Sequence, residues 1–193
     1  NKPVLHFDGE DDYLSVSNSP SVAIAGDITT FFVVNFDDFD TYRAVWAKTL
    51  VNQPGPNDWY ALPITGIPRA YRGNGLGANG SVDGTTALTA GVYLIAGFDM
   101  AGTTLHHYLN GESTGEGQLS TTIADAGKSL LIGTRDDLFT KMKGDIAEII
   151  IYNAALSAAD RSKVVIYLST KYGIPVSAGP PQLAISRSGN NVT

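Results

Sequence analysis

The sequence predicts an all-β protein in which two antiparallel sheets pack face to face, with one α-helix near the C-terminal end. Short apolar runs rich in Val, Ile, Phe and Tyr recur along the chain and alternate with polar residues, as in half-buried strands. The 193 residues include 21 glycines, a share that favours many turns. Apolar residues at helical spacing stand out in one segment, residues 157–172.

Five strands are predicted in the first half, at Val4–Phe7, Tyr13–Val16, Ile28–Phe36, Ala44–Thr49 and Trp59–Ile64. The first two flank the acidic turn at Asp8-Gly9, so they are expected to form a hairpin. The segment 54–58 contains two prolines and a glycine and is predicted to be a loop, as is the Gly/Asn-rich segment 73–84.

Four strands are predicted in the second half, at Val92–Phe98, Thr104–Leu109, Ser129–Gly133 and Gly144–Tyr152. Asn110-Gly111 follows the second of these strands and is a strong signal for a type I′ turn, because both residues tolerate positive φ. The many short strands that are separated by turn residues favour a sandwich.

The helix is predicted from its ends as well as from its apolar stripe. Ser157 is a suitable N-cap, and Asp160 stands three residues later, as the acid of a capping box does. Val164, Val165, Leu168 and Tyr172 form the apolar stripe. Gly173 then ends the helix, followed by Pro175. We expect this helix to pack on the sandwich.

Composition indicates one globular domain over residues 1–174, with 43% hydrophobic and 17% charged residues in the whole chain. Residues 175–181 are predicted to be a linker, and residues 182–193 the truncated start of a following β module. A net charge of −6 without a cluster of Lys and Arg argues against nucleic acid as a partner. The apolar runs are too short for a membrane span, and the lack of Cys excludes disulfides.

Four segments carry a resemblance to a known family. They are Leu5–Leu14, Leu105–Gly111, Leu131–Gly133 and Gly144–Ser157, in that order. Together they resemble the laminin-G-like, concanavalin A-like jelly rolls that occur as accessory domains in large bacterial surface and secreted proteins. The resemblance covers roughly residues 3–174. It implies a jelly-roll β-sandwich with one concave sheet, a secreted or cell-surface location, and neighbouring domains of the same chain as partners.

The same family gives two interpretations of the acidic turn, which contains Asp8, Glu10, Asp11 and Asp12. As a hairpin turn it needs no further function, since Asp and Gly both favour turns. The alternative is a structural calcium ion with Asp8 and Asp12 among its ligands. Some relatives complete such a site with an Asp on the closing strand, where this chain has Ala147. No other cofactor is expected.

Catalysis is not expected, although the architecture also carries glycoside hydrolases and polysaccharide lyases. Such hydrolases place paired acids on one strand face, as E-x-D-x-x-E, and this pattern is absent from the sequence. Asp145 and Glu148 are expected on opposite faces of their strand, because their separation is odd. An enzyme with an unrecognised site is kept as the second alternative.

Binding of a polysaccharide is the function that the sequence favours, on the concave sheet or its rim loops. Sugars stack on aromatic rings and bond to polar side chains around them. The expected ligand-binding residues are Trp46, Lys48, Trp59, Arg69, Tyr71, Arg72, Asn74, His106 and Tyr108. For the two tryptophans a place in the core is equally open, and a core position is favoured for Tyr13, Tyr93 and Tyr152. The first alternative is a protein-adhesion or structural spacer module.

Overall fold

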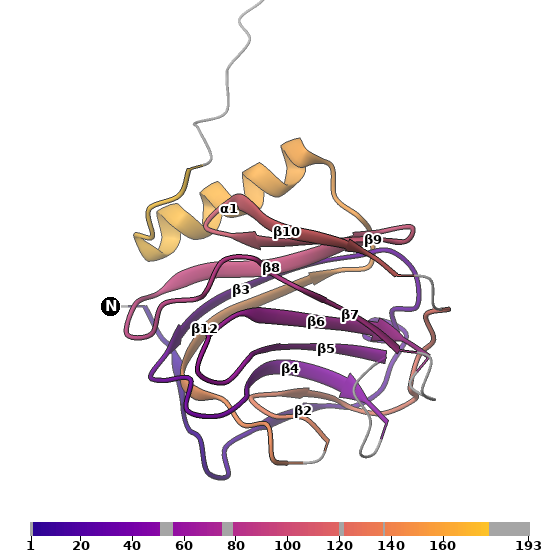
Figure 1. Ribbon diagram of the computed structural model, residues 1–193, viewed down its shortest axis with the longest axis horizontal. Coiled ribbons are helices and arrows are strands. Elements are labelled where there is room, and N and C mark those ends of the chain that lie inside the picture. Colours follow the sequence, from indigo (N-terminus) through magenta and orange to yellow (C-terminus); the bar gives the residue numbers. More distant parts are fainter. Residues whose placement is uncertain (1, 51–55, 75–78, 120–121, 137, 178–193) are drawn as a thin grey trace, which may run out of the picture.

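The computed structural model describes residues 2–50, 56–74, 79–119, 122–136 and 138–177. Two six-stranded antiparallel sheets pack face to face, and a helix lies on the outside of one of them (Figure 1). This arrangement confirms the predicted sandwich and its single C-terminal helix. The predicted following module at 182–193, and the linker from residue 178 onward, lie outside the described residues.

We name the two sheets by their position relative to the helix. The helix-side sheet contains, in spatial order, β1 (Leu5–Asp8), β12 (Lys143–Tyr152), β3 (Ile28–Phe36), β8 (Leu94–Ala101), β9 (Thr104–Leu109) and β10 (Glu112–Gln118). The opposite sheet contains β2 (Leu14–Val16), β11 (Leu130–Ile132), β4 (Arg43–Thr49), β5 (Pro56–Ala61), β6 (Pro68–Gly73) and β7 (Asn79–Asp83).

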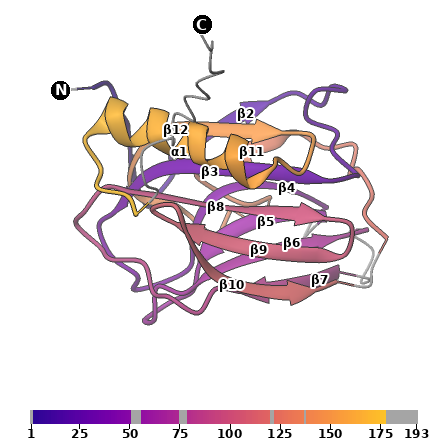
Figure 2. The same cartoon turned by 90° about the horizontal axis from the view of Figure 1, so that it is seen from above.

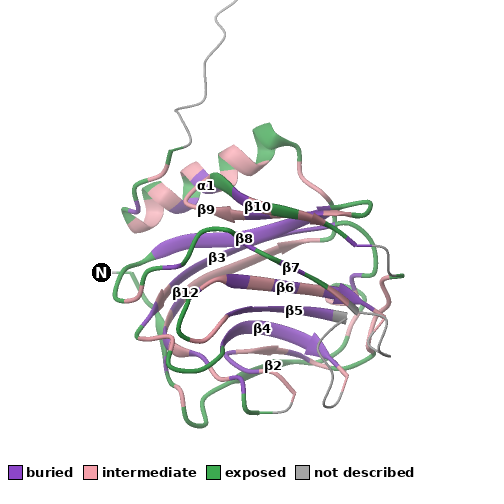
Figure 3. Ribbon diagram, in the orientation of Figure 1, coloured by how far each residue is buried: buried purple, intermediate pink, exposed green. Residues whose placement is uncertain are grey.

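The core lies between the sheets, and the ribbons of β3, β4, β5 and β8 are coloured mostly as buried (Figure 3). Phe32 of β3 packs against Trp59 of β5, with ring centroids 4.9 Å apart. Phe98 of β8 lies parallel to Trp46 of β4 at 6.4 Å. Each aromatic side chain of this size stabilises the fold by roughly 2–3 kcal/mol through removal of apolar surface from water.

The helix α1 (Ala158–Tyr172) lies across the helix-side sheet (Figure 2). Its predicted ends are confirmed. Ser157 Oγ accepts a hydrogen bond from the N–H of Asp160 at 3.1 Å, and Gly173 has the left-handed conformation, with φ 71°. Val165 and Leu168 are buried against the outer face of the sheet in a second apolar cluster. In the described part of the chain, no helix has the length and apolar character needed to cross a membrane.

The strands β6, β7 and β10 were not predicted, because their sequences are rich in Gly and polar residues. β7 falls within the segment 73–84 that was expected to be a loop, and β5 begins at Pro56, within the other predicted loop at 54–58, so both loop predictions are wrong in part. The glycines are needed where these strands approach the rest of the sandwich: a Cβ at Gly117 would lie 2.8 Å from Val82, and one at Gly80 would lie 2.5 Å from Leu119. The predicted turn between β9 and β10 is confirmed, since Asn110 and Gly111 both have positive φ.

The predicted hairpin at the start of the chain is wrong. β1 pairs with β12, whereas β2 pairs with β11, so the two strands belong to different sheets. The acidic segment between them connects the helix-side sheet to the opposite sheet. A sequence pattern of strand, turn and strand is the same for a hairpin and for such a connection, and only the pairing distinguishes them.

Candidate functional site

Both tryptophans lie in the core, so the expectation of exposed rings is wrong. Trp46 is 2% exposed and Trp59 is fully buried. An irregularity between Ala44 and Trp46 shifts the register of β4, and Trp46 then lies opposite Trp59 on the inner face. β5 ends at Ala61, three residues before the predicted end at Ile64, and its Trp59 belongs to the core between the sheets.

Lys48 and Arg72 are buried at one end of the sandwich. Lys48 Nζ donates to Asn18 at 2.8 Å and pairs with Asp125. The Arg72 guanidinium donates to Asn57 and to the carbonyl of Ile24, the latter at 3.2 Å. Burial lowers the pKa of Arg72 to about 10. These two head groups hold loops onto the sheet, and their burial removes them from the surface that a ligand can touch.

Arg69 and Tyr71 remain on the surface, on the outer face of the opposite sheet. The Tyr71 ring is half-buried and lies over the Tyr60 ring, with centroids 6.1 Å apart and planes 27° apart. The Tyr42 ring meets Tyr60 edge-on at 5.5 Å. We call the outer surface formed by Arg69, Tyr71 and Asp83, with the buried Tyr60 (4% exposed) beneath them, the tyrosine face. Asn74, also predicted, is half-buried just beyond the end of β6.

The charges of the tyrosine face are paired. Arg69 donates from Nε and a terminal nitrogen to the two carboxylate oxygens of Asp83, at 2.5 and 2.7 Å. Asp83 is the cross-strand partner of Arg69, so the pairing of β6 and β7 builds this contact. The same carboxylate raises the pKa of the guanidinium. Because β7 was predicted to be a loop, no sequence pattern indicated this partner.

Two further residues of the β11–β12 connection reach the same side of the opposite sheet. Arg135 lies 3.8 Å from Asp58 of β5, and Asp136 accepts a hydrogen bond from Thr49 of β4 at 2.7 Å. Burial and the neighbouring Asp58 raise the pKa of Tyr60, so its phenol stays neutral. The face therefore offers aromatic rings and fixed hydrogen-bonding groups without an excess of positive charge.

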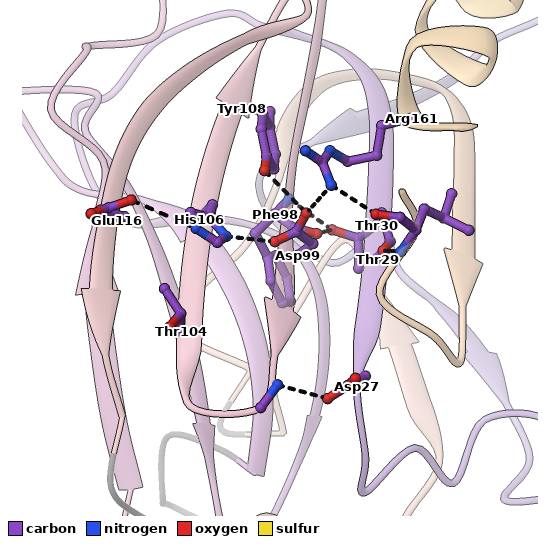
Figure 4. A network of polar contacts seen from close by, with 12 residues as sticks. Asp27, Thr29, Thr30, Phe98, Asp99, Thr104, His106, Tyr108, Glu116 and Arg161 are labelled. Carbon is purple, nitrogen blue, oxygen red and sulfur yellow. Dashed lines mark hydrogen bonds and ion pairs between the residues drawn. The ribbon is translucent and has the colours of Figure 1, made fainter. Parts of the chain in front are cut away.

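His106 and Tyr108 lie in a different place, on the outer face of the helix-side sheet (Figure 4). They surround the buried carboxylate of Asp99, which is the cross-strand partner of His106. His106 Nδ1 is 2.8 Å from Asp99, and the Tyr108 hydroxyl donates to it at 3.1 Å. Arg161 of α1 completes the cluster, 3.0 Å from Asp99 and with its guanidinium 4.8 Å from the centroid of the Tyr108 ring.

This cluster joins the helix to the sheet. Arg161 also donates to the carbonyl of Leu156 at 2.8 Å. Thr29 of β3 binds the same segment, donating to the Ala154 carbonyl at 2.8 Å and accepting from the Leu156 N–H at 2.9 Å. The nine predicted ligand-binding residues therefore do not form one site: two lie in the core, two in a buried polar region, two on the tyrosine face, two at this joint, and Asn74 lies just beyond the end of β6.

The predicted metal ligands serve the backbone of the acidic connection. Asp8 Oδ1 accepts a hydrogen bond from the N–H of Glu10 at 2.7 Å, and Asp12 Oδ2 accepts one from the N–H of Asp8 at 3.1 Å. Over the described ranges there is no group of three or more His, Asp or Glu side chains with the arrangement of a metal site.

The prediction that Asp145 and Glu148 lie on opposite faces is wrong, because β12 has a bulge. Asp145 is paired with Asn35 and Glu148 with Val33, so both acids lie on the outer face of the helix-side sheet. The extra residue at this point, Ala147, reverses the alternation. Asp145 contacts His6 and Tyr93, whereas Glu148 contacts Lys171 and Tyr167.

Solved structures share this fold at low sequence identity. A carbohydrate-binding module, CBM40 of the Ruminococcus gnavus IT-sialidase bound to α2,3-sialyllactose, superposes with a TM-score of 0.68 at 15% identity and covers 86% of this chain and 96% of that one. The binding domain of Paraclostridial Mosquitocidal Protein 1 gives 0.68 at 11%, and this chain spans 43% of it. A putative carbohydrate-binding protein from Bacteroides ovatus gives 0.62 at 12%, covering 80% of this chain and 44% of that one.

Identities of this size establish the fold alone. No curated protein matches the sequence. The model of a laminin-G family, described as the concanavalin A-like lectin/glucanases superfamily, matches residues 8–160, which is most of the described sandwich. With two antiparallel sheets and that match over more than half of its length, this chain belongs to the concanavalin A-like lectin/glucanase superfamily.

Proposed function

We propose that this chain is a non-catalytic carbohydrate-binding module that holds a polysaccharide on the tyrosine face. The observation that carries this proposal is the half-buried Tyr71 ring, which stacks on the buried Tyr60 and lies beside the Arg69–Asp83 pair, on three adjacent strands. A sugar ring has one apolar face, which packs on an aromatic ring, and hydroxyls that both donate and accept hydrogen bonds.

The polar groups of the face favour hydroxyls over anions as ligands. Arg69 is neutralised by Asp83, and Arg135 lies near Asp58. In each pair the guanidinium and the carboxylate hold each other in place. Binding a ligand to them therefore costs less side-chain entropy than binding to unpaired, mobile side chains would. The solved relatives support a glycan ligand, since one is a carbohydrate-binding module with sialyllactose bound.

The absence of catalysis is part of the proposal. The described acids of the tyrosine face are engaged with cations or a hydroxyl, and the two acids of β12 lie on the other side of the molecule. A secreted or surface location in a multidomain bacterial protein, with the neighbouring domains as partners, fits a module of this kind. The alternative is a spacer or protein-adhesion module with no glycan ligand.

Affinity electrophoresis in gels that contain single polysaccharides tests the proposal. We expect the wild-type protein to be retarded by at least one neutral β-glucan, xylan, mannan or galactan, and Tyr71→Ala to abolish that retardation. Tyr13→Ala is the matched control, because Tyr13 is 50% exposed and directly precedes β2, at the edge of the opposite sheet away from β6 and β7. Migration unchanged in every gel, with all proteins folded by circular dichroism, would favour the spacer alternative.

A further inference from the structure

A groove of 640 Å³ lies on the helix-side sheet, away from the tyrosine face. It is lined by Lys2, Val4, Tyr93, Lys171, Tyr172 and Gly173. These residues come from the segment before β1, the segment before β8 and the C-terminal end of α1. Ligand pockets in proteins commonly enclose 300–1,000 Å³, so the groove has room for a short oligosaccharide.

The bulge in β12 organises the walls of this groove. Asp145 and Glu148 share the outer face, where Asp145 contacts the groove residue Tyr93 and Glu148 contacts the groove residue Lys171. The Tyr93 hydroxyl donates to Asp145 at 2.5 Å, and His6 Nδ1 lies 2.9 Å from the same carboxylate. The core position favoured for Tyr93, like that for Tyr13, is wrong, since these residues are 38% and 50% exposed. With its hydroxyl held by Asp145, Tyr93 presents its ring at the groove.

The second wall is held by Glu148 and by the backbone of the bulge. Lys171 Nζ donates to Glu148 and to the Tyr167 hydroxyl, both at 2.9 Å. The Tyr172 hydroxyl donates to the carbonyl of Ala147 at 3.2 Å. Lys171 also lies 5.3 Å from the centroid of the Tyr172 ring. An aromatic ring and an ammonium group are thus positioned next to one another before any ligand binds.

The chemistry of the lining identifies the class of ligand. Two tyrosine rings and two ammonium groups line the groove, whereas the two carboxylates are absent from the lining and accept hydrogen bonds from the lining residues Tyr93 and Lys171. Lys2 has no ion-pair partner within the described ranges. Rings accept the apolar face of a sugar, and ammonium groups attract a negative charge.

We propose that this groove is a second glycan site, selective for an acidic oligosaccharide whose sugar rings pack against Tyr93 and Tyr172 and whose carboxylate lies between Lys2 and Lys171. The site is independent of the tyrosine face. It differs from that face in charge, since Lys2 has no ion-pair partner in the described ranges and Lys171 is held by Glu148, whereas both described guanidinium groups there are paired with carboxylates. Binding should weaken as salt is added, because the ammonium groups are near the surface.

The test is a titration of the ¹⁵N-labelled protein with a galacturonate trisaccharide, followed by amide chemical shifts, with a neutral galactose trisaccharide as the matched probe. We expect the acidic sugar to move the amides of Tyr93 and of residues 171–173, and the neutral one to bind more weakly. Tyr93→Ala and Lys2→Ala should each weaken binding about two- to tenfold, the range expected for one stacked ring or one exposed charge.

Two controls keep the result interpretable. Lys163→Ala removes an exposed lysine from the other end of the same helix and should leave the affinity unchanged. Tyr71→Ala should also leave it unchanged, which separates failure of the groove from failure of the tyrosine face. Equal affinity for the neutral and the acidic sugar, or no shift at the groove with either, would overturn the proposal.

Discussion

The outer faces of the two sheets carry different kinds of side chain. On the helix-side sheet, Phe31, Val33 and Ile95 point outward, and α1 buries them with Val165 and Leu168. On the opposite sheet, the corresponding outward positions hold Tyr60, Tyr71, Arg69 and Asp83. Both sheets have six strands, so sheet size does not explain the difference. The apolar outer face is the one that α1 covers.

The polar groups on the two faces also serve different ends. On the helix-side sheet they lie at the margins of the apolar patch, where Asp99 pairs with Arg161 and Glu148 with Lys171. These pairs connect the sheet to the helix. On the tyrosine face, Arg69 and Asp83 belong to neighbouring strands of one sheet, where they position each other. Ion pairs thus attach the helix to the helix-side sheet, whereas the pair on the opposite sheet fixes the position of two surface side chains.

The largest effect is expected for the interior beneath the tyrosine face. Trp59→Ala removes a fully buried ring that contacts Phe32, and should lower the free energy of unfolding by about 3–5 kcal/mol. Tyr71→Ala, on the surface of the same sheet, should lower it by less than about 1 kcal/mol. Urea unfolding followed by fluorescence measures both. Equal losses would contradict the separation of a structural inner face from a functional outer face.

The joint between helix and sheet should show the next largest effect. Asp99→Ala leaves Arg161, His106 and Tyr108 without their common acceptor, and should cost about 2–4 kcal/mol. Hydrogen exchange should then be faster across α1 than in β4–β6. Glu116→Gln is the control. Glu116 also carries a negative charge near His106, but its side chain is 72% exposed and its carboxylate is 3.6 Å from His106 Nε2, beyond hydrogen-bond distance. Unchanged exchange in α1 would show that apolar contacts alone hold the helix.

Sequence patterns predicted the elements whose contacts are local or whose strands are strongly apolar. The helix was predicted at both ends because Ser157 and Gly173 act within one turn of it. β3 was predicted because Ile28–Phe36 is apolar on both faces, one buried by the opposite sheet and the other by α1.

The rest depends on pairings between distant residues. Arg69 finds Asp83 only because β7 pairs with β6, and β7 has a sequence rich in small and polar residues. The faces of Trp46 and Glu148 depend on irregularities in β4 and β12, each of which shifts the alternation by one residue. Alternation in a sequence does not reveal a bulge, so the site could be predicted only in part.

The loops at one end of the sandwich carry a pH-dependent contribution that belongs to neither face. Burial alone would raise the pKa of Asp38, but hydrogen bonds from Lys143 and Arg43 outweigh it and hold the pKa at about 2. Since this value lies below the unfolded value of about 3.9, the contribution is complete above pH 4 and is lost as the pH falls toward 2.

This contribution amounts to about 2 kcal/mol when the shift is converted to free energy. We expect Asp38→Asn to lose about that much stability at pH 6 and almost none at pH 2, measured by urea unfolding at each pH. Lys143→Met should reproduce part of the loss at pH 6, because its ammonium lies 2.8 Å from Asp38. A variant that loses the same stability at both pH values would show that packing, and not charge, accounts for this contact.

The smallest effect is expected from removal of metal at the acidic connection. A calcium ion at 100 times its dissociation constant would stabilise the fold by about 2.7 kcal/mol, and EDTA would then lower the melting temperature by several degrees. We expect a change below about 1 °C, because Asp8 and Asp12 already accept hydrogen bonds from backbone N–H groups. Asp12→Ala should cost about 1 kcal/mol through loss of its bond to the Asp8 N–H, with or without calcium. A fall in melting temperature that calcium restores in the wild type, and not in Asp12→Ala, would instead establish a metal site between the two sheets.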